Sequence, residues 1–139
     1  MAILNPYLSF AGNAREAMTA YQGIFGGELN IMTFRDMGMT EHDGVPIDAD
    51  RVMHGQLTTD EGFTLMGADQ PPSMGEPKNG SVSLSGDEEE LLSGYFTKLA
   101  DGGTVGEPLA KAPWGDSFGM ATDKFGIDWM VNISGAPAE

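Results

Sequence analysis

The chain has 139 residues, and its 21 acidic residues outnumber its 7 basic residues to give a formal net charge of −14. This length suits one domain or two small modules that share a core. Nucleic acids and anionic membranes bind cationic surfaces, so neither is an expected partner. The chain has no cysteine and therefore forms no disulfide. It also lacks a long apolar run and a signal peptide, which predicts a cytoplasmic protein.

The first expected elements are a strand and a helix. Residues 3–10 have the character of a strand, although the proline among them cannot donate to a ladder. Asn13 followed by Glu16 predicts a capping box at the start of an amphipathic helix. Gly26 and Gly27 predict its end, with one of the two in a left-handed conformation.

The next stretch predicts three strands around an irregular loop. Residues 29–34 indicate a strand, whereas residues 35–50 break every periodicity and predict a lid or a crossing connection, with His42 solvated. Residues 51–58 and 63–66 predict a hairpin. Simple alternation along its first strand puts Val52 on the same face as His54 and Gln56. Residues 68–80 contain three prolines and predict a linker.

The pattern then begins again. Residues 81–84 predict a strand, and Ser85 or Asp87 is the expected cap of a second helix that ends at Gly102-Gly103. Residues 104–109 and a terminal hairpin supply three further strands. The apolar face of the second helix consists of Leu91, Leu92, Tyr95, Phe96 and Leu99.

The terminal hairpin has the clearest pattern in the chain. Its turn is Asp123-Lys124-Phe125-Gly126, where Asp supports a local turn and Gly supplies a positive φ. After the turn, apolar residues alternate with Asp128, Met130 and Asn132. This alternation predicts a strand whose apolar face, which includes Trp129, packs on helices while Met130 faces the other way.

Similar residues recur at a nearly constant spacing. Leu8 corresponds to Val82 at an offset of 74 residues, and Tyr21 corresponds to Phe96 at an offset of 75. A repeat that spans the chain predicts an α+β fold with two copies of a β-α-β-β-β unit. The expected division is a first module at 1–68, a linker at 69–80 and a second module at 81–139.

Several segments of this duplicated unit resemble one protein family. They are PYLSF, GNAREA, FGGEL, VMHGQL and the terminal WG…FG…TDKFGIDWM. With them the chain resembles the PhnB-like branch of the vicinal oxygen chelate superfamily, which includes glyoxalase I, bleomycin-resistance proteins and extradiol dioxygenases. This branch is often named after 3-demethylubiquinone-9 3-methyltransferase. The resemblance implies two curved mixed sheets that enclose a pocket.

The resemblance also implies where metal ligands would lie in metal-dependent members. The four positions fall on Asn5, Gln56, Ser81 and Met130, with His54 on the same face as Gln56. Catalytic divalent ions prefer imidazole and carboxylate ligands, which this set lacks. We therefore expect no metal and no other cofactor. A glycine-rich cofactor loop between a strand and a helix is also absent from the sequence, which argues against methyl transfer.

The resulting hypothesis is a pocket, free of metal, that binds or sequesters a small organic molecule, in a protein expected to be a homodimer. No catalytic residue is assigned. One alternative is a lyase, isomerase or dioxygenase whose divalent ion is held by His54, a loop carboxylate and water. Another is a regulatory subunit that acts through its dimer surface. The expected ligand-binding residues are Asn5, Tyr7, His54, Gln56, Ser81, Trp114 and Met130.

Overall fold

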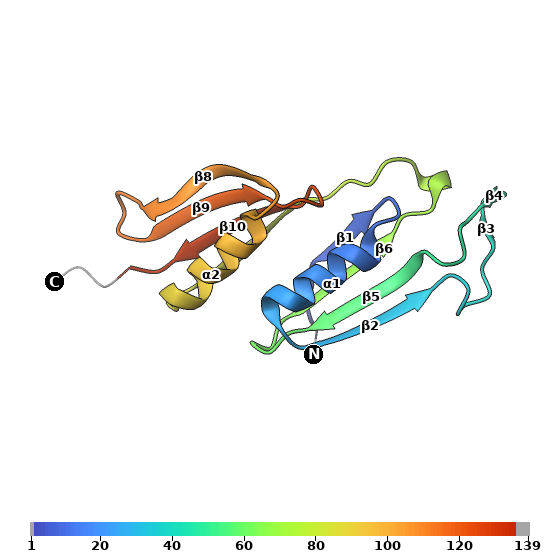
Figure 1. Ribbon diagram of the computed structural model, residues 1–139, viewed down its shortest axis with the longest axis horizontal. Helices are drawn as coiled ribbons and strands as arrows, with labels where there is room; N and C mark the ends of the chain where they lie inside the picture. The colour runs from blue at the N-terminus through green and yellow to red at the C-terminus, as the bar shows by residue number, and fades with distance from the viewer. Residues whose placement is uncertain (1, 136–139) are drawn as a thin grey trace. The chain divides into compact units, whose positions relative to one another are not determined.

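The computed structural model describes residues 2–135 of the chain. They belong to two compact units, Met1–Asn79 and Gly80–Glu139. Both units are mixed four-stranded sheets with one helix on one face (Figure 1). The predicted α+β class with two β-α-β-β-β modules is confirmed.

In the first unit, helix α1 (Ala14–Phe25) covers one face of a sheet with the strand order β1-β6-β5-β2. Strand β1 is parallel to β6, and the other neighbours are antiparallel. The elements of the sheet are β1 (Tyr7–Phe10), β2 (Glu28–Thr33), β5 (Val52–Thr58) and β6 (Thr64–Asp69). A small hairpin of β3 (Glu41–His42) and β4 (Val45–Pro46) precedes β5, and a 3-10 turn, η1 (Pro72–Met74), follows β6.

The second unit repeats this plan without the extra hairpin. Helix α2 (Glu89–Ala100) lies on a sheet with the strand order β7-β10-β9-β8. Strand β7 is parallel to β10, as β1 is to β6. The strands are β7 (Ser81–Gly86), β8 (Thr104–Lys111), β9 (Ser117–Thr122) and β10 (Asp128–Ile133).

The hydrogen bonds define which residues of the two units correspond. Gln70 donates its backbone N–H to Phe10 in the first unit, as Ser134 donates to Gly86 in the second. The offset is therefore 76 residues for the first strand of each unit and 64 residues for the last hairpin. The predicted offset of 74 for the first strand was wrong by two residues. The first unit carries 12 extra residues between these points, in the segment that contains β3 and β4.

Each unit has its own apolar core between helix and sheet. The alternation expected in the last strand is confirmed, because Trp129 is 1% exposed and Val131 is fully buried. The first core includes Leu8, Phe10, Met18, Tyr21, Phe25, Leu57 and Leu65, and the second includes Leu92, Tyr95, Phe96, Leu99, Ile127, Trp129, Val131 and Ile133.

The predicted helix caps were wrong. Asn13 is the residue before α1, but its side chain makes no capping hydrogen bond. The backbone N–H groups of Gly12 and Ala14 donate instead to Asp69 Oδ1, at 2.8 and 3.0 Å. The second helix begins after Glu88, again without a side-chain cap, and not after Ser85 or Asp87. A distant carboxylate can replace a local cap because it offers the same acceptor to the first N–H groups of the helix.

Two further predictions were wrong: the start of the first strand, and the absence of regular structure from residues 35–50. The first strand begins at Tyr7 and not at residue 3, although the Pro6 carbonyl already accepts from the Met66 N–H. The segment 35–50 contains the β3–β4 hairpin, whose turn residues Asp43 and Gly44 both have positive φ. This geometry is typical of a two-residue hairpin turn, for which Asp-Gly is a preferred pair.

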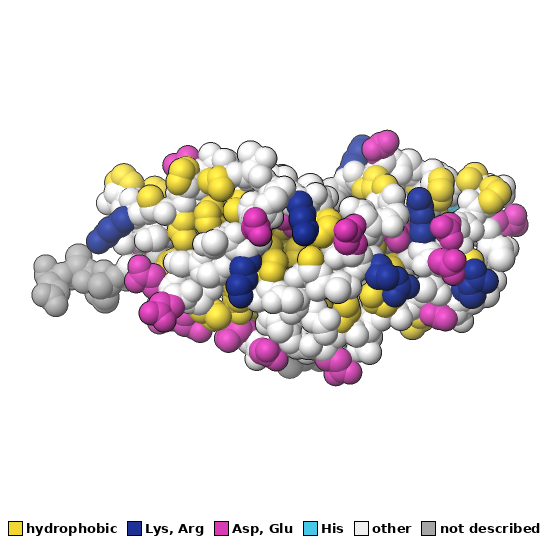
Figure 2. Space-filling view, in the orientation of Figure 1, with side chains coloured by type: hydrophobic (Ala, Val, Ile, Leu, Met, Phe, Trp, Pro, Cys, Tyr) yellow, Lys and Arg dark blue, Asp and Glu magenta, His cyan; other side chains and the backbone are white. Residues whose placement is uncertain are grey.

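Acidic side chains occur over both units on the face drawn in Figure 2, with Lys and Arg side chains between them. The Lys and Arg side chains do not gather into a single basic patch on that face, which is consistent with the net negative charge of the sequence. Of the helices within residues 2–135, none combines the length and apolarity needed to cross a membrane.

Candidate functional site

The first sheet has one face against α1 and one open face. Met18 of the helix lies close to Gly55 and Gly67, so these glycines belong to the helix face. The residues that alternate with them, including His54 and Gln56, belong to the open face. The predicted pairing of His54 with Gln56 on one face is thus confirmed.

A β-bulge changes the face of one predicted neighbour. Met32 lies opposite His54, but Thr33 lies opposite Val52, so Met53 is an extra residue in β5. Val52 is 1% exposed and its side chain lies beside Gly55, on the helix face. The prediction that Val52 shares the face of His54 was wrong, because simple alternation does not anticipate a bulge. Met53 turns to the open face next to His54.

Tyr7 and His54 meet on the open face. The Tyr7 hydroxyl lies 3.3 Å from His54 Nδ1, and the two ring centroids are 5.7 Å apart. Partial burial raises the pKa of the Tyr7 phenol above its ordinary value. The phenol therefore stays protonated at neutral pH. This contact is satisfied when a neutral His54 accepts at Nδ1 and carries its proton on Nε2.

Gln56 lies two residues beyond His54 along β5, on the same face. The sheet register aligns Tyr7, Met66, Gln56 and Asn30 across the four strands. By alternation the open face also carries Ser9, Glu28, Met32, Thr58, Thr64 and Ala68, and none of these residues is Lys or Arg. Apart from Glu28 on the edge strand, the face therefore offers neutral hydrogen-bonding groups beside thioether and methyl groups.

A depression of about 250 Å³ adjoins the Tyr7–His54 pair. Its wall includes open-face residues of β1 and β6, the bulge residue of β5, and the segment that follows β6. The lining residues are Tyr7, Ser9, Phe34, Met53, Ala68, Asp69, Gln70, Pro71 and Met74.

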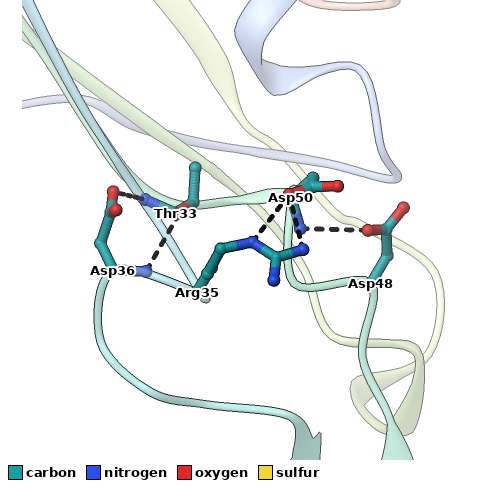
Figure 3. A network of polar contacts seen from close by, with 5 residues as sticks. All are labelled: Thr33, Arg35, Asp36, Asp48 and Asp50. Atoms are coloured by element: carbon teal, nitrogen blue, oxygen red, sulfur yellow. Dashed lines mark hydrogen bonds and ion pairs between the residues drawn. The ribbon is translucent and has the colours of Figure 1, made fainter.

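A polar network lies at the base of the 35–50 segment, next to Phe34 in the sequence (Figure 3). Arg35 donates through Nε and Nη2 to Asp50 Oδ1, at 3.1 and 2.9 Å, and the Asp50 N–H donates to Asp48. The Thr33 N–H donates to Asp36, and hydrogen bonding from Thr33 lowers the pKa of that carboxyl below its ordinary value. The Arg35–Asp50 contact joins the two ends of the segment, whereas the Thr33–Asp36 and Asp48–Asp50 bonds are local to one end each.

The remaining predicted residues do not belong to this contact. Asn5 lies before β1 and is half-buried. Ser81, Trp114 and Met130 belong to the second unit, where Met130 pairs with Ser83 and with Met120. Trp114 is 66% exposed, and its ring lies 6.4 Å from that of Phe118.

Sequence reasoning missed the residues that shape the depression. Ala68 and Gln70 fell in or beside the predicted linker, and simple alternation puts Met53 on the face opposite His54. The Asp43-Gly44 pair was a usable signal for the hairpin of the 35–50 segment. His42, expected to be solvated, has its Nδ1 2.7 Å from the Ser73 hydroxyl of η1.

The site does not have the donor set of a metal centre. Within residues 2–135, no three His, Asp or Glu side chains gather in a group suited to a metal ion. The neighbours of His54 on the open face are Tyr7, Met32 and Gln56, which supply no carboxylate. A divalent ion of the kind used in catalysis prefers imidazole and carboxylate ligands together.

Sequence comparisons place the chain among known proteins. The family model for 3-demethylubiquinone-9 3-methyltransferase matches residues 2–132. Protein YjdN from Escherichia coli (strain K12) is 31% identical over 140 residues, which cover 94% of each chain.

Solved structures give the same picture. Protein PA1353 from Pseudomonas aeruginosa is 38% identical with a TM-score of 0.79, covering 96% of this chain and 98% of the other. A PhnB protein from Bacillus cereus is 26% identical with a TM-score of 0.71, covering 96% and 100%. A glyoxylase/bleomycin resistance protein/dioxygenase domain from Frankia sp. EAN1pec is 11% identical, with a TM-score of 0.64 and coverage of 96% and 98%. At that identity the likeness concerns the fold alone.

Proposed function

The chain belongs to the 3-demethylubiquinone-9 3-methyltransferase family, in the PhnB-like branch of the glyoxalase superfamily, and from this premise we propose that it binds a small organic molecule without a metal ion. The binding surface is the open face of the first sheet. The observation that carries the proposal is the 3.3 Å contact between Tyr7 and His54 on that face.

The chemistry of the face favours a neutral ligand. No Lys or Arg lies at its sheet positions, so an anionic group would meet no counter-charge. With the Tyr7 O–H donated to His54 Nδ1, the Tyr7 oxygen offers an acceptor, the Nε2–H of His54 offers a donor, and the Gln56 amide offers both. Two to three such groups beside apolar surface are typical of sites that orient a small molecule. The role of the protein is then binding or sequestration.

Methyl transfer is not part of the proposal. A nucleoside methyl donor of the usual kind binds at a glycine-rich turn that opens a helix after a parallel strand. Here the N–H groups of Gly12 and Ala14 at the start of α1 already donate to Asp69. The positions expected from metal-dependent relatives, Asn5 and Gln56 in this unit, likewise do not fit a divalent ion.

A fragment screen tests the proposal. Neutral organic fragments are screened by saturation-transfer NMR against the wild-type protein, and hits are titrated against His54→Ala and His42→Ala. Loss of one ligand hydrogen bond is expected to weaken the hits about tenfold in His54→Ala, which corresponds to about 1.4 kcal/mol. His42→Ala is the matched control, because His42 contacts Ser73 and not Tyr7. Hits that bind equally to both variants would contradict the proposal.

The absence of a metal is tested separately. Protein purified without a histidine tag is analysed for Zn, Ni, Mn and Fe. Stoichiometric metal that is lost in His54→Ala would overturn the claim of a metal-free site. The homodimer and the cytoplasmic location remain part of the proposal, and a monomeric mass at micromolar concentration would contradict the dimer.

A further inference from the structure

Ala68 is the floor of the depression on the open face. Strand β6 lies between β1 and β5, and Ala68 is paired with Ser9 of β1. It is only 9% exposed although it lies on the face opposite α1. Gln70, Pro71 and Met74, from the segment after β6, line the same depression as Ala68. A larger side chain at position 68 would fill the space.

The walls of the depression are largely apolar and include no Lys or Arg. Met53 reaches it from β5 because of the bulge, and Phe34 and Met74 line it as well. Two polar lining residues are already engaged. Both Asp69 carboxylate oxygens accept backbone N–H groups, and the Gln70 amide donates to the carbonyls that follow η1, at 2.9 to 3.3 Å. The Gln70 contacts also hold Met74 in place as part of the wall.

The volume limits the occupant to a small ring system. A dry apolar cavity of about 150 Å³ accommodates benzene. Pockets for drug-sized ligands begin at about 300 Å³. The depression, at about 250 Å³, lies between these values. It therefore fits one ring or two fused rings.

Thioether groups favour a flat aromatic ring over a saturated one. Sulfur next to an aromatic ring contributes about 0.3–1.5 kcal/mol. Met53 and Met74 both line the depression, and Tyr7 lies at its wall with its hydroxyl at His54. A ring in the depression can thus direct one substituent to this pair.

We propose that the depression binds a neutral aromatic ring of one or two fused cycles that carries a hydroxyl or carbonyl group, and that Ala68 sets the size of the ring. This inference rests on the proposed binding function and names its ligand class. The ring contacts Met53 and Met74, and the polar substituent meets the Tyr7–His54 pair.

The test uses 2-naphthol, phenol and decahydro-2-naphthol as probes. The protein carries methyl-labelled methionine, and the signals are assigned by single substitutions. An aromatic probe shifts nearby methyl signals through its ring current. We expect saturable shifts for Met53 and Met74 with 2-naphthol. The Met18 methyl is the internal control, because Met18 is fully buried on the helix side of the sheet.

Ala68→Leu tests the floor. We expect it to weaken 2-naphthol about tenfold and phenol less than about threefold, where one decade corresponds to about 1.4 kcal/mol. Thr64→Leu is the matched control, since Thr64 lies on the same strand and face but does not line the depression. Decahydro-2-naphthol is expected to bind more weakly than 2-naphthol to the wild-type protein. Circular dichroism verifies that each variant is folded.

The outcomes separate this inference from the proposed function. If 2-naphthol binding depends on His54 but not on Ala68, or shifts other methionines, the ring site is wrong and the proposed function stands. Equal affinity for the saturated and aromatic probes would also overturn the aromatic preference. If neither His54→Ala nor Ala68→Leu affects any probe, both proposals fail.

Discussion

The two units share one topology but differ on their open faces. By the hydrogen-bond correspondence, Ser83 occupies the position of Tyr7 and Phe118 the position of His54. The polar pair of the first unit is thus replaced by a hydroxyl and a phenyl ring in the second. The same backbone plan therefore carries different chemistry in each copy, and the plan alone does not determine the function.

The units also differ in where they bury a carboxylate. Asp69 is 2% exposed and accepts three backbone N–H groups at the open end of the first hairpin, whereas its counterpart Ile133 is apolar. Asp123 is 5% exposed and accepts at the turn of the second hairpin, where the first unit has Thr59. Within residues 2–135 each unit has one buried acid, and the two acids stabilise opposite ends of equivalent hairpins.

Removing the first of these acids is expected to have the largest effect. Asp69→Ala leaves the N–H groups of Gly12, Ala14 and Val52 without their acceptor. Hydrogen bonds to charged groups contribute about 1.5–3 kcal/mol each, with incomplete additivity, so we expect a loss of about 3–5 kcal/mol in unfolding free energy. Urea unfolding measures the loss, and hydrogen exchange at Gly12 and Val52 localises it.

The control for this prediction is Glu61→Ala, in the exposed turn of the same hairpin. An exposed substitution of this kind changes stability by less than about 0.5 kcal/mol. If Asp69→Ala is no more destabilising than Glu61→Ala, the carboxylate does not hold the start of α1.

Exchanging the turn residues sharpens the comparison between the hairpins. Asp123→Thr places the residue of the first hairpin in the second. Thr59 accepts the Phe63 N–H through its hydroxyl, so the equivalent bond from the Ile127 N–H is expected to survive. The Trp129 indole N–H, which donates to Asp123 Oδ2 at 2.9 Å, loses that acceptor. We expect a loss of about 1.5–3 kcal/mol.

Urea unfolding of Asp123→Thr and Asp123→Ala distinguishes the two contributions. Asp123→Ala removes both the backbone and the indole contacts and should be the less stable variant. Equal stability of the two variants would show that the hydroxyl does not replace the carboxylate at the turn. The fluorescence of Trp129, which is almost fully buried, reports whether the indole environment has changed.

The fold was largely predictable because its signals are local. Apolar alternation identified the last strand, and helix periodicity with terminal glycines identified α1 and its end. The helix caps were not predictable in the same way. Asp69 bonds to Gly12 and Ala14 across more than fifty residues, so no local motif contains both partners.

The candidate site was predictable only in part for the same reason. Tyr7 and His54 were expected on one face through the family resemblance, and the sheet register brings them into contact. Met53 reaches that face only because of a bulge, and Ala68 shares the depression with Gln70, Pro71 and Met74 because the chain turns at η1 after β6. Neither feature leaves a periodic pattern in the sequence.

A pair of equivalent glycines offers a smaller test. Gly55 and Gly119 both face the helix of their unit. A Cβ at Gly119 would lie 2.9 Å from the Leu109 Cα and from a ring carbon of Phe96, whereas at Gly55 the nearest atom is the Gly67 carbonyl oxygen at 3.3 Å. We expect Gly119→Ala to cost about 1–3 kcal/mol.

Gly55→Ala should cost less, because its tightest new contact is at 3.3 Å instead of 2.9 Å and alanine recovers about 0.5–1 kcal/mol relative to glycine in a strand. Thermal unfolding of both variants measures the difference. A cost for Gly55→Ala equal to that for Gly119→Ala would mean that the two helices do not approach their sheets as differently as the distances indicate.

The smallest expected effect concerns Asp116, which has hydrogen-bond partners particular to the second unit. Its carboxylate accepts the Gly135 N–H at 2.9 Å and the Asn132 amide at 3.1 Å. These two bonds lower the pKa of Asp116 below the ordinary 3.8, and the bond from Gly135 is the larger cause.

A lowered folded-state pKa means that the contribution of Asp116 to stability is present above the unfolded-state pKa and is lost as the pH falls through the folded-state pKa. Carboxyl NMR should therefore give a titration midpoint below 3.8. Asn132→Ala, which introduces the residue of the equivalent position 68, should raise the midpoint but not fully to 3.8, because the Gly135 N–H still donates. A wild-type midpoint at or above the ordinary value would show that these two bonds do not form in solution.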